Sequence, residues 1–243
     1  MGLVLMTLGL LGWLLWGGLR ALPSGAGPAL RGPLGIGLRV SVEALALCLP
    51  VGVAAGLWLA RFAPHGRRVR ALRFALDELA ALPAVAYGVA GVVILRALGA
   101  RGGGDLPAAA LLAVMNLPLV VGLSEEALRG VPLELEEASL ALGATRAQTA
   151  ARVSLPLAWR GLAAAAVLGS GRALAECAPL LCLGAVGAQP ETLSVWLWRA
   201  HDGATGNAGA ATAAALLVLI AAATTELGHR LRPRPATTTA PIG

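Results

Sequence analysis

The sequence predicts an all-α protein that crosses a membrane several times. Hydrophobic residues make up 57% of its 243 residues and charged residues only 13%, with a mean hydropathy of +0.76. An ordinary soluble domain is about 25% charged. Continuous apolar runs of about 20 residues, the length of a membrane-spanning helix, recur along the chain, and no alternating strand pattern competes with them. We therefore expect one polytopic domain with about six transmembrane helices.

The predicted spans follow these apolar runs in chain order. They cover residues 3–19, 36–60, 79–98, 106–123, 161–183 and 208–225. The polar segment 124–160 separates the fourth span from the fifth. The tail, residues 232–243, holds three Pro and three Thr and is predicted to be disordered because it cannot bury a core. A cleaved signal peptide ending near Ser24-Gly25-Ala26 is an alternative for the first span, and the uncharged stretch Met1–Met6 disfavours it.

Arginine is unevenly divided between the two sides that these spans define. Twelve Arg follow the second, fourth and sixth spans, and six lie in the other connections. Because cytoplasmic loops carry the excess of positive residues, the richer side is predicted to be cytoplasmic, together with both termini and segment 124–160. The twelve are Arg61, Arg67, Arg68, Arg70, Arg73, Arg129, Arg146, Arg152, Arg160, Arg230, Arg232 and Arg234, and the six are Arg20, Arg31, Arg39, Arg96, Arg101 and Arg199.

Composition also excludes several classes of function. All 19 basic residues are Arg, and a P-loop requires a Lys that reaches the nucleotide phosphates, so this chain is not expected to hold such an ATPase site. Its net charge of +6 is distributed between apolar runs, whereas a nucleic-acid-binding domain has a basic face. No catalytic, metal or disulfide site is predicted, because the Cys lie in apolar runs and the His are scattered. These residues are Cys48, Cys177, Cys182, His65, His201 and His229.

Segment 124–160 carries a spaced motif. Glu137-Ala138-Ser139 is followed after three residues by Gly143, and nine further residues lead to Val153-Ser154-Leu155-Pro156. Good helix formers surround Gly143, which predicts a helix, a turn and a second helix. Gly143 is either the residue that ends the first helix or a place where another backbone comes close. Pro156 marks the entry to the next span.

This motif resembles the E-A-A-x3-G-x9-I-x-L-P signature of ABC importer permeases, with Ser139 in place of the second Ala. The resemblance implies that Glu137, Ala138, Gly143, Leu155 and Pro156 couple the chain to an ATPase, through a short helix that inserts into a groove on the partner. The alternative is an amphipathic loop that lies on the membrane surface.

A second run indicates a more specific family. Residues 171–180, GRALAECAPL, resemble the G-R-A-x-G-E-T-A-P-L run of the A-type permease subunit of the phosphate-specific (Pst) importer. The sister subunit usually continues G-E-T-M-A instead. Further similar segments are ELAALPAVAYG at 78–88 and Asn116-Leu117-Pro118-Leu119 leading into Glu125-Glu126-Ala127-Leu128-Arg129 and Pro132.

The resemblance implies a type I ABC importer permease fold and the import of inorganic phosphate across the inner membrane by alternating access. Its partners would be a homologous second permease subunit, a dimer of ATP-binding subunits that holds ATP and Mg, and a periplasmic phosphate-binding protein. Membrane lipid would surround the chain, which would bind neither a cofactor nor nucleic acid.

Arg172 and Glu176 place two charges inside the fifth predicted span. An Arg at the centre of a membrane helix costs about 2.5–3.5 kcal/mol on insertion scales, and Glu176, one turn on, can pair with it. The pair is either a structural ion pair or part of an anion path, where a guanidinium matches an oxyanion. Pro179 is predicted to bend the helix beyond the pair. Cys177 replaces the family's Thr and removes a hydroxyl.

Three other functions compete with phosphate import. The same machinery could carry sulfate, molybdate or tungstate. A gradient-driven secondary transporter would be expected to show inverted repeats and broken helices in both halves, which the sequence does not display. An intramembrane Ser hydrolase would need Ser170 and His201 within hydrogen-bond reach, and His201 lies in an external loop beyond the span.

Overall fold

The computed structural model describes residues 26–64, 66–99, 104–187, 189–200 and 207–232, and these residues contain helices and no strand. The all-α prediction is confirmed. The helices are α2 (Ala26–Leu57), η2 (Trp58–Phe62), α3 (Arg67–Ala81), α4 (Ala84–Ala97), α5 (Asp105–Arg129), α6 (Leu133–Ala141), α7 (Arg146–Thr149), η3 (Ala150–Ser154), α8 (Leu155–Ala175), α9 (Ala178–Leu183), α10 (Leu193–Arg199) and α11 (Asn207–Leu231), of which η2 and η3 are π-helical.

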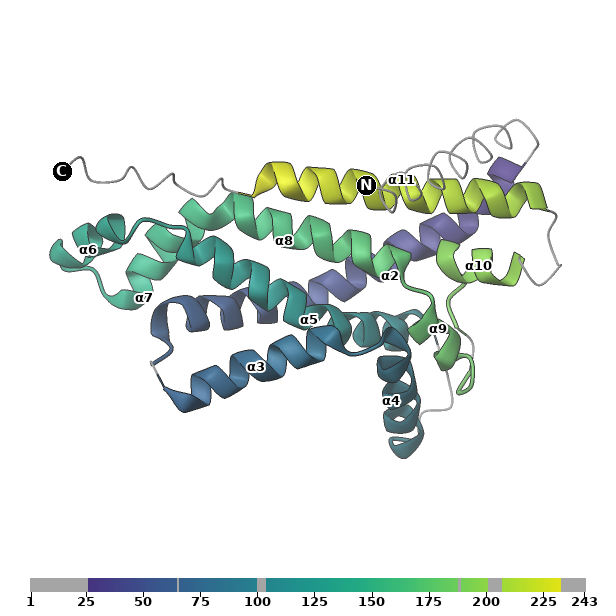
Figure 1. Ribbon diagram of the computed structural model, residues 1–243, viewed down its shortest axis with the longest axis horizontal. Coiled ribbons are helices and arrows are strands. Elements are labelled where there is room, and N and C mark those ends of the chain that lie inside the picture. Colours follow the sequence, from purple (N-terminus) through teal and green to yellow (C-terminus); the bar gives the residue numbers. More distant parts are fainter. Residues whose placement is uncertain (1–25, 65, 100–103, 188, 201–206, 233–243) are drawn as a thin grey trace, which may run out of the picture.

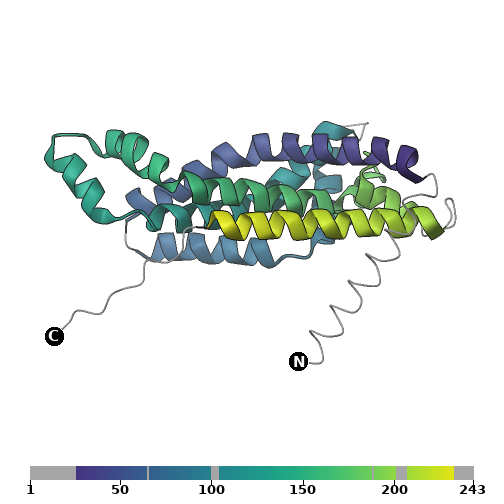
Figure 2. The same ribbon diagram turned by 90° about the horizontal axis from the view of Figure 1, so that it is seen from above.

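The four membrane-length helices, which are built on α2, α5, α8 and α11, form a bundle along the longest axis of the molecule (Figures 1 and 2). α5 lies in its middle and packs against α2 on one side and α8 on another, and α11 packs against α8. Within the described residues, four helices are long and apolar enough to cross a membrane, and a fifth crossing results if the bent pair α3–α4 counts as one. The four are Leu30–Phe62, Asp105–Arg129, Arg146–Ala175 and Ala210–Leu231.

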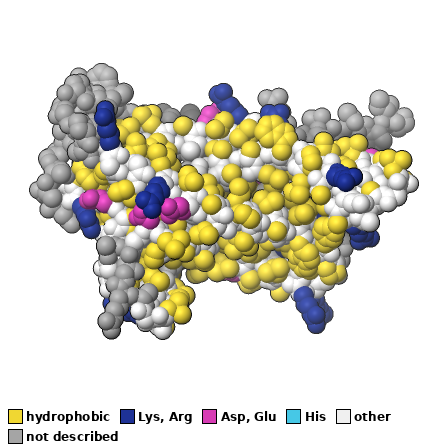
Figure 3. All heavy atoms as spheres, turned by 180° about the vertical axis from the view of Figure 1, so that it is seen from behind, with side chains coloured by type: hydrophobic (Ala, Val, Ile, Leu, Met, Phe, Trp, Pro, Cys, Tyr) yellow, Lys and Arg dark blue, Asp and Glu magenta, His cyan; other side chains and the backbone are white. Residues whose placement is uncertain are grey.

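Much of the surface of the bundle is apolar. Hydrophobic side chains form a broad band across the middle of the face in Figure 3, and arginines lie mainly toward its ends and edges. Large apolar residues such as Val93 and Val114 are more than half exposed. Exposed Trp58 and Trp159 lie near one end of the long helices and exposed Trp198 near the other, an arrangement typical of the two membrane interfaces. This surface is suited to lipid.

The predicted span 79–98 differs from the structure, because a bend of 99° divides it into the end of α3 and the whole of α4. The bend falls at Leu82-Pro83, where both backbones are extended. Proline lacks an N–H and disfavours helical conformation in the residue before it. The Tyr87 hydroxyl donates a hydrogen bond of 2.7 Å to the Leu79 carbonyl across the bend and holds its two sides together.

The predicted span 161–183 is also divided. Its helix begins earlier, at Arg146, runs without a break to Ala175 and stops there, and α9 follows separately. The second, fourth and sixth spans occur as longer helices than predicted, and segment 124–160 is shortened because α5 and α8 extend into it. The predicted span 3–19 and the tail 233–243 lie outside the described residues.

Ion pairs show which segments share an end of the bundle. Arg61 contacts Glu136, Arg73 contacts Glu125, and Arg232 contacts Glu126. The three Arg-rich segments that were predicted to lie on one side of the membrane therefore meet at the same end, where α6 and α7 project (Figure 1). At the opposite end Arg39 pairs with Asp105.

Candidate functional site: the projecting loop and the broken helices

The projecting loop is a helix–turn–helix, as the sequence predicted. Gly143 has a positive φ of +86°, a conformation that L side chains rarely adopt. The Gly143 N–H donates to the Leu140 carbonyl at 2.9 Å, and the Ala144 N–H donates to the Ser139 carbonyl at 3.2 Å. This pair of bonds is a Schellman motif. Of the two interpretations of Gly143, the structure supports the one in which it ends the first helix.

The second helix of the loop is part of a membrane helix. Thr145 caps it: its hydroxyl accepts from the Gln148 N–H, and the Gln148 side chain accepts from the Thr145 N–H in a capping box. α7 then continues through η3 into α8, so that Arg146–Ala175 is one unbroken helix of 30 residues, about 45 Å long at 1.5 Å per residue. The loop and the far end of this helix are therefore parts of one continuous element.

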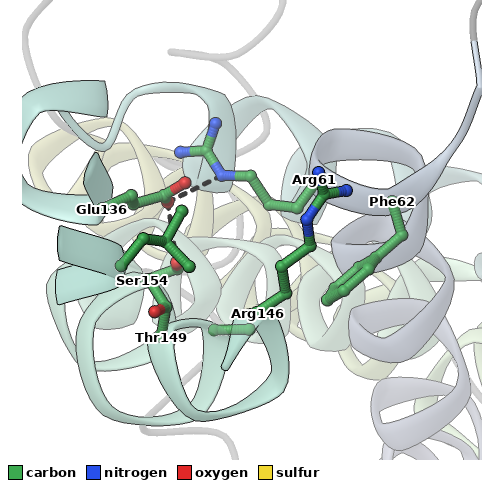
Figure 4. A pocket seen from close by; sticks show the side chains of 8 residues that line it. Arg61, Phe62, Glu136, Arg146, Thr149 and Ser154 are labelled. Carbon is green, nitrogen blue, oxygen red and sulfur yellow. Dashed lines mark hydrogen bonds and ion pairs between the residues drawn. The ribbon is translucent and has the colours of Figure 1, made fainter. Parts of the chain in front are cut away.

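Glu136 joins the loop to two long helices (Figure 4). Its Oε1 lies 2.8 Å from Arg61 Nε and accepts a hydrogen bond of 2.7 Å from Ser154 Oγ. Arg61 belongs to η2, at the end of α2, and Ser154 belongs to η3, at the start of α8. Single-turn π segments are frequent at functional sites. We call Arg61, Glu136 and Ser154 the Glu136 cluster.

The Glu136 cluster is largely enclosed and well supplied with partners. The Arg61 and Glu136 side chains are 12% and 13% exposed. Arg61 also donates to the carbonyls of Leu128 and Val131, at 2.6 and 3.2 Å, and so fixes the end of α5. A hollow of about 240 Å³ lies beside the cluster, and Arg146 extends over it (Figure 4). The cluster holds the loop in one orientation relative to α2, α5 and α8.

The predicted coupling residues divide into two groups. Glu137, Ala138 and Gly143 are exposed on the projecting loop, where a partner can reach them. Leu155 is half-buried and packs onto the apolar cluster that includes Leu128, at the end of α5, and the exposed Pro156 lies in the first turn of α8. The predicted coupling residues are thus divided between the exposed surface of the loop and its junction with the bundle.

The second candidate region is the break between α8 and α9. Arg172 lies in the last turn of α8, and Glu176 follows with an extended backbone. The two are loosely paired, with 3.7 Å between Arg172 Nε and Glu176 Oε1, and are 34% and 19% exposed. Arg172 is thirteen residues beyond the exposed Trp159, about 20 Å along a helix, and so lies within the depth of a hydrocarbon core of about 30 Å.

The helix is interrupted at Glu176 and Cys177, whereas the sequence predicted a bend caused by Pro179 beyond the Arg172–Glu176 pair. Pro179 lies in the first turn of α9, where its missing N–H costs no hydrogen bond. The carbonyl of Glu176 is satisfied instead by the Ser194 hydroxyl at 2.8 Å. α9 packs against α4, the other helix that follows a break. A Cβ at Gly88 would lie 2.8 Å from Pro179 Cα and 2.8 Å from Cys182 Cβ, so this contact requires glycine.

Sequence reasoning missed the Glu136 cluster. Its acidic member stands beside the motif residue Glu137, and Arg61 is one of several Arg that the sequence does not distinguish. The contacts between them span 75 positions, and no local pattern reports such a pairing. The helix 133–141 has no buried apolar face that would separate the half-buried Glu136 from the exposed Glu137, so its local sequence offers no signal for the cluster.

A bundle of membrane-length helices with an apolar surface defines a multi-pass membrane protein. The chain belongs to the family described as "Binding-protein-dependent transport system inner membrane component", whose model matches residues 52–233. The expected family is thereby confirmed, and the chain is a transmembrane subunit.

Curated relatives agree with this assignment. The chain is 34% identical over 156 residues to "Probable ABC transporter permease protein YqgI" of Bacillus subtilis, covering 64% of this chain and 53% of the relative. It is 35% identical over 187 residues to "Phosphate transport system permease protein PstC 2" of Mycobacterium tuberculosis, covering 67% and 56%. It is 35% identical over 144 residues to PstA 1 of the same species, covering 58% and 45%. The chain thus spans about half the length of these relatives.

Solved structures share the fold. A chain of the MetNI methionine ABC transporter, in inward-facing conformations, superimposes with a TM-score of 0.69 at 24% identity, covering 83% of this chain and 94% of that one. This likeness confirms the predicted type I ABC importer permease fold.

Proposed function

We propose that this chain is a permease subunit of an ATP-driven importer that moves inorganic phosphate across the inner membrane by alternating access. The phosphate assignment is supported by the relatives named as phosphate transport system permeases and by residues 171–180. Relatives named PstA and PstC both match, so the A-type assignment depends on the run Ala175-Glu176-Cys177-Ala178-Pro179.

The observation that carries the proposal is the unbroken helix Arg146–Ala175. It begins in the loop that resembles an ATPase-docking motif and ends one residue before Glu176. When bound ATP moves the ATPases, the loop moves with them, and this helix transfers the motion to the break beside Arg172. Arg172 contributes positive potential to an anion path there. Glu176 pairs with Arg172 during the change between the states of the transport cycle.

The proposed assembly has four further parts. A homologous second permease completes the path, two ATP-binding subunits dock on the loop and hold ATP and Mg, and a periplasmic phosphate-binding protein delivers the anion. This chain itself contributes no ATPase site and no cofactor. The Arg-rich end of the bundle faces the cytoplasm, in accord with the positive-inside rule, and both termini are proposed to lie on the same side of the membrane.

Uptake by the complete complex in proteoliposomes tests the substrate. We expect ATP-dependent accumulation of radiolabelled phosphate that requires the binding protein and withstands a tenfold excess of sulfate, molybdate or tungstate. Dissipating ion gradients should not abolish it. Equal competition by one of these oxyanions, or uptake driven by a gradient without ATP, would contradict the proposal.

Gly143 variants test the coupling step. Gly143→Val should leave the chain inserted and assembled but lower the ATPase stimulation by loaded binding protein, because a β-branched residue at φ +86° costs at least the roughly 1–2 kcal/mol of a left-handed L-residue. Gly143→Asn is the control, since Asn tolerates this conformation. Normal stimulation in the Asn variant would show that the backbone conformation at this position is what matters. Reduced stimulation in the Asn variant as well would show that the ATPase approaches Gly143 too closely for any side chain. Normal stimulation in the Val variant would refute docking at this turn.

A further inference from the structure

A hollow of about 230 Å³ lies at the Arg-rich end of the bundle, apart from the loop and from the broken helices. It is formed by the end of η2, the first turn of α3 and the end of α5, and three arginines line it: Arg70, Arg73 and Arg129. Its volume is sufficient for a phosphate group.

The charge in this hollow is unbalanced. Arg73 and Arg129 share one carboxylate oxygen, Glu125 Oε1, at 2.9 and 2.8 Å. Arg73 also donates to the Leu59 carbonyl at 3.2 Å. The Arg70 side chain is exposed and has no hydrogen bond or ion pair within the described part of the chain. Three guanidinium groups therefore face one carboxylate, and two positive charges are not neutralised.

Backbone groups add to the positive potential. Gly66, the N-cap residue of α3, also lines the hollow, and no side chain caps this helix of 15 residues. The N–H groups of its first turn are unpaired by the helix itself and carry the positive end of its dipole. These N–H groups add to the positive potential of the hollow, most of which comes from the three arginines.

The position of the hollow indicates what fills it. The membrane-length helices Leu30–Phe62 and Asp105–Arg129 both end beside it. Trp58, Phe62 and Phe74 in the segments around it are exposed, as is typical of side chains at the level of lipid headgroups. Basic pockets at this level bind anionic lipid headgroups.

We propose that this hollow binds the phosphate group of an anionic phospholipid in the adjacent leaflet. Arg70 is its free ligand, and Arg73 and Arg129, held in place by Glu125, present the remaining donors. Guanidinium groups bind phosphate oxygens bidentately. Inorganic phosphate offers the same chemistry, and the experiment separates the two sources. The assignment of this lipid to the cytoplasmic leaflet rests on the proposed function, and the rest of the proposal does not.

Lipid binding to the purified full-length chain, counted by native mass spectrometry, tests this site. We expect phosphatidylglycerol to bind more tightly than phosphatidylcholine of the same acyl length. Arg70→Gln should weaken phosphatidylglycerol binding about fivefold, the effect of one basic residue at an anionic surface, and Arg70→Lys should retain most of it. Arg68→Gln is the matched control: it removes the same charge from the same exposed turn but does not line the hollow, and should change binding less than twofold.

Several results would overturn the proposal. Equal binding of the two lipids, or equal losses in the Arg68 and Arg70 variants, would show diffuse attraction without a site. Displacement of phosphatidylglycerol by millimolar inorganic phosphate, with sulfate inactive, would reassign the hollow to free phosphate. Unchanged lipid binding in Arg70→Gln with weakened ATPase assembly would reassign it to a protein contact. None of these measurements requires transport. The lipid-binding proposal can therefore be rejected while the import proposal stands, and the reverse also holds.

Discussion

The two ends of the bundle differ in how their helices and charges are arranged. At the end with the projecting loop, α2 continues through η2 and α7 continues through η3 into α8 without interruption. At the other end both α3–α4 and α8–α9 are broken, and the helices that follow the breaks pack on each other. The loop end is therefore built from continuous helices, and the other end contains two helix breaks.

The ion pairs follow the same division. Arg61 and Glu136 are 2.8 Å apart, and the Arg61 guanidinium also bonds two carbonyls. Arg172 and Glu176 are 3.7 Å apart. The buried Nε of each arginine makes no hydrogen bond among the described residues, so the two pairs differ in the separation of their charges and in the two carbonyl bonds of Arg61. A tightly bonded pair stabilises one geometry, whereas a loose pair beside a joint can be exchanged for other partners at low cost. The difference assigns rigidity to the loop end and rearrangement to the break.

The largest expected effect is at the Glu136 cluster. Glu136→Ala should lower the free energy of unfolding by about 3 kcal/mol, because it leaves the enclosed Arg61 without its counter-charge. Unfolding by SDS in mixed micelles measures this. Glu134→Ala, which removes an exposed carboxylate from the same helix, should change stability by less than about 0.5 kcal/mol. Equal effects of the two substitutions would remove the distinction between the ends of the bundle.

A smaller loss is expected where the two broken helices meet. Gly88→Ala should cost about 1–3 kcal/mol, the usual range for overpacking, because its Cβ would press on the Pro179 backbone. Gly122→Ala is the control, since nothing lies within 4 Å of its added Cβ and Ala favours a helix. Thermal unfolding of the purified chain should separate the two variants. A Gly88 variant as stable as the control would indicate that the contact between α4 and α9 opens freely.

The smallest effect on stability is expected at Arg172 and Glu176. The double variant Arg172→Met, Glu176→Met should change the free energy of unfolding by less than about 1 kcal/mol, because apolar replacements are often neutral even for fully buried ion pairs and this pair is only partly buried. Phosphate uptake should nevertheless be lost if Arg172 shapes the anion path. Assembly, stability and uptake are measured together. A stable, assembled double variant with normal uptake would leave the pair with a structural role alone.

Much of the loop was predictable because its signals are local. Gly143 has a positive φ because the first helix of the loop ends there, and a left-handed residue commonly ends a helix. Glycine adopts this conformation at the least cost. The capping residue Thr145 likewise acts on backbone three residues away. The site at the break was predicted less well: Arg172 and Glu176 were identified, but the helix was expected to continue through them. Pro179 marked the region without specifying on which side the helix would stop.

By itself, the sequence determined that this chain is an all-α membrane protein, because long apolar runs must bury their backbone polar groups in helices when no water is available. It also determined the motif of the loop and the pair of charges near the break, since residue types and short spacings express them directly. Only the tertiary structure decided that Glu136 rather than Glu137 joins the loop to the bundle, that two spans are broken, and that three arginines surround one hollow. Each of these depends on contacts between segments far apart in the chain, where packing selects one partner among many of the same chemistry.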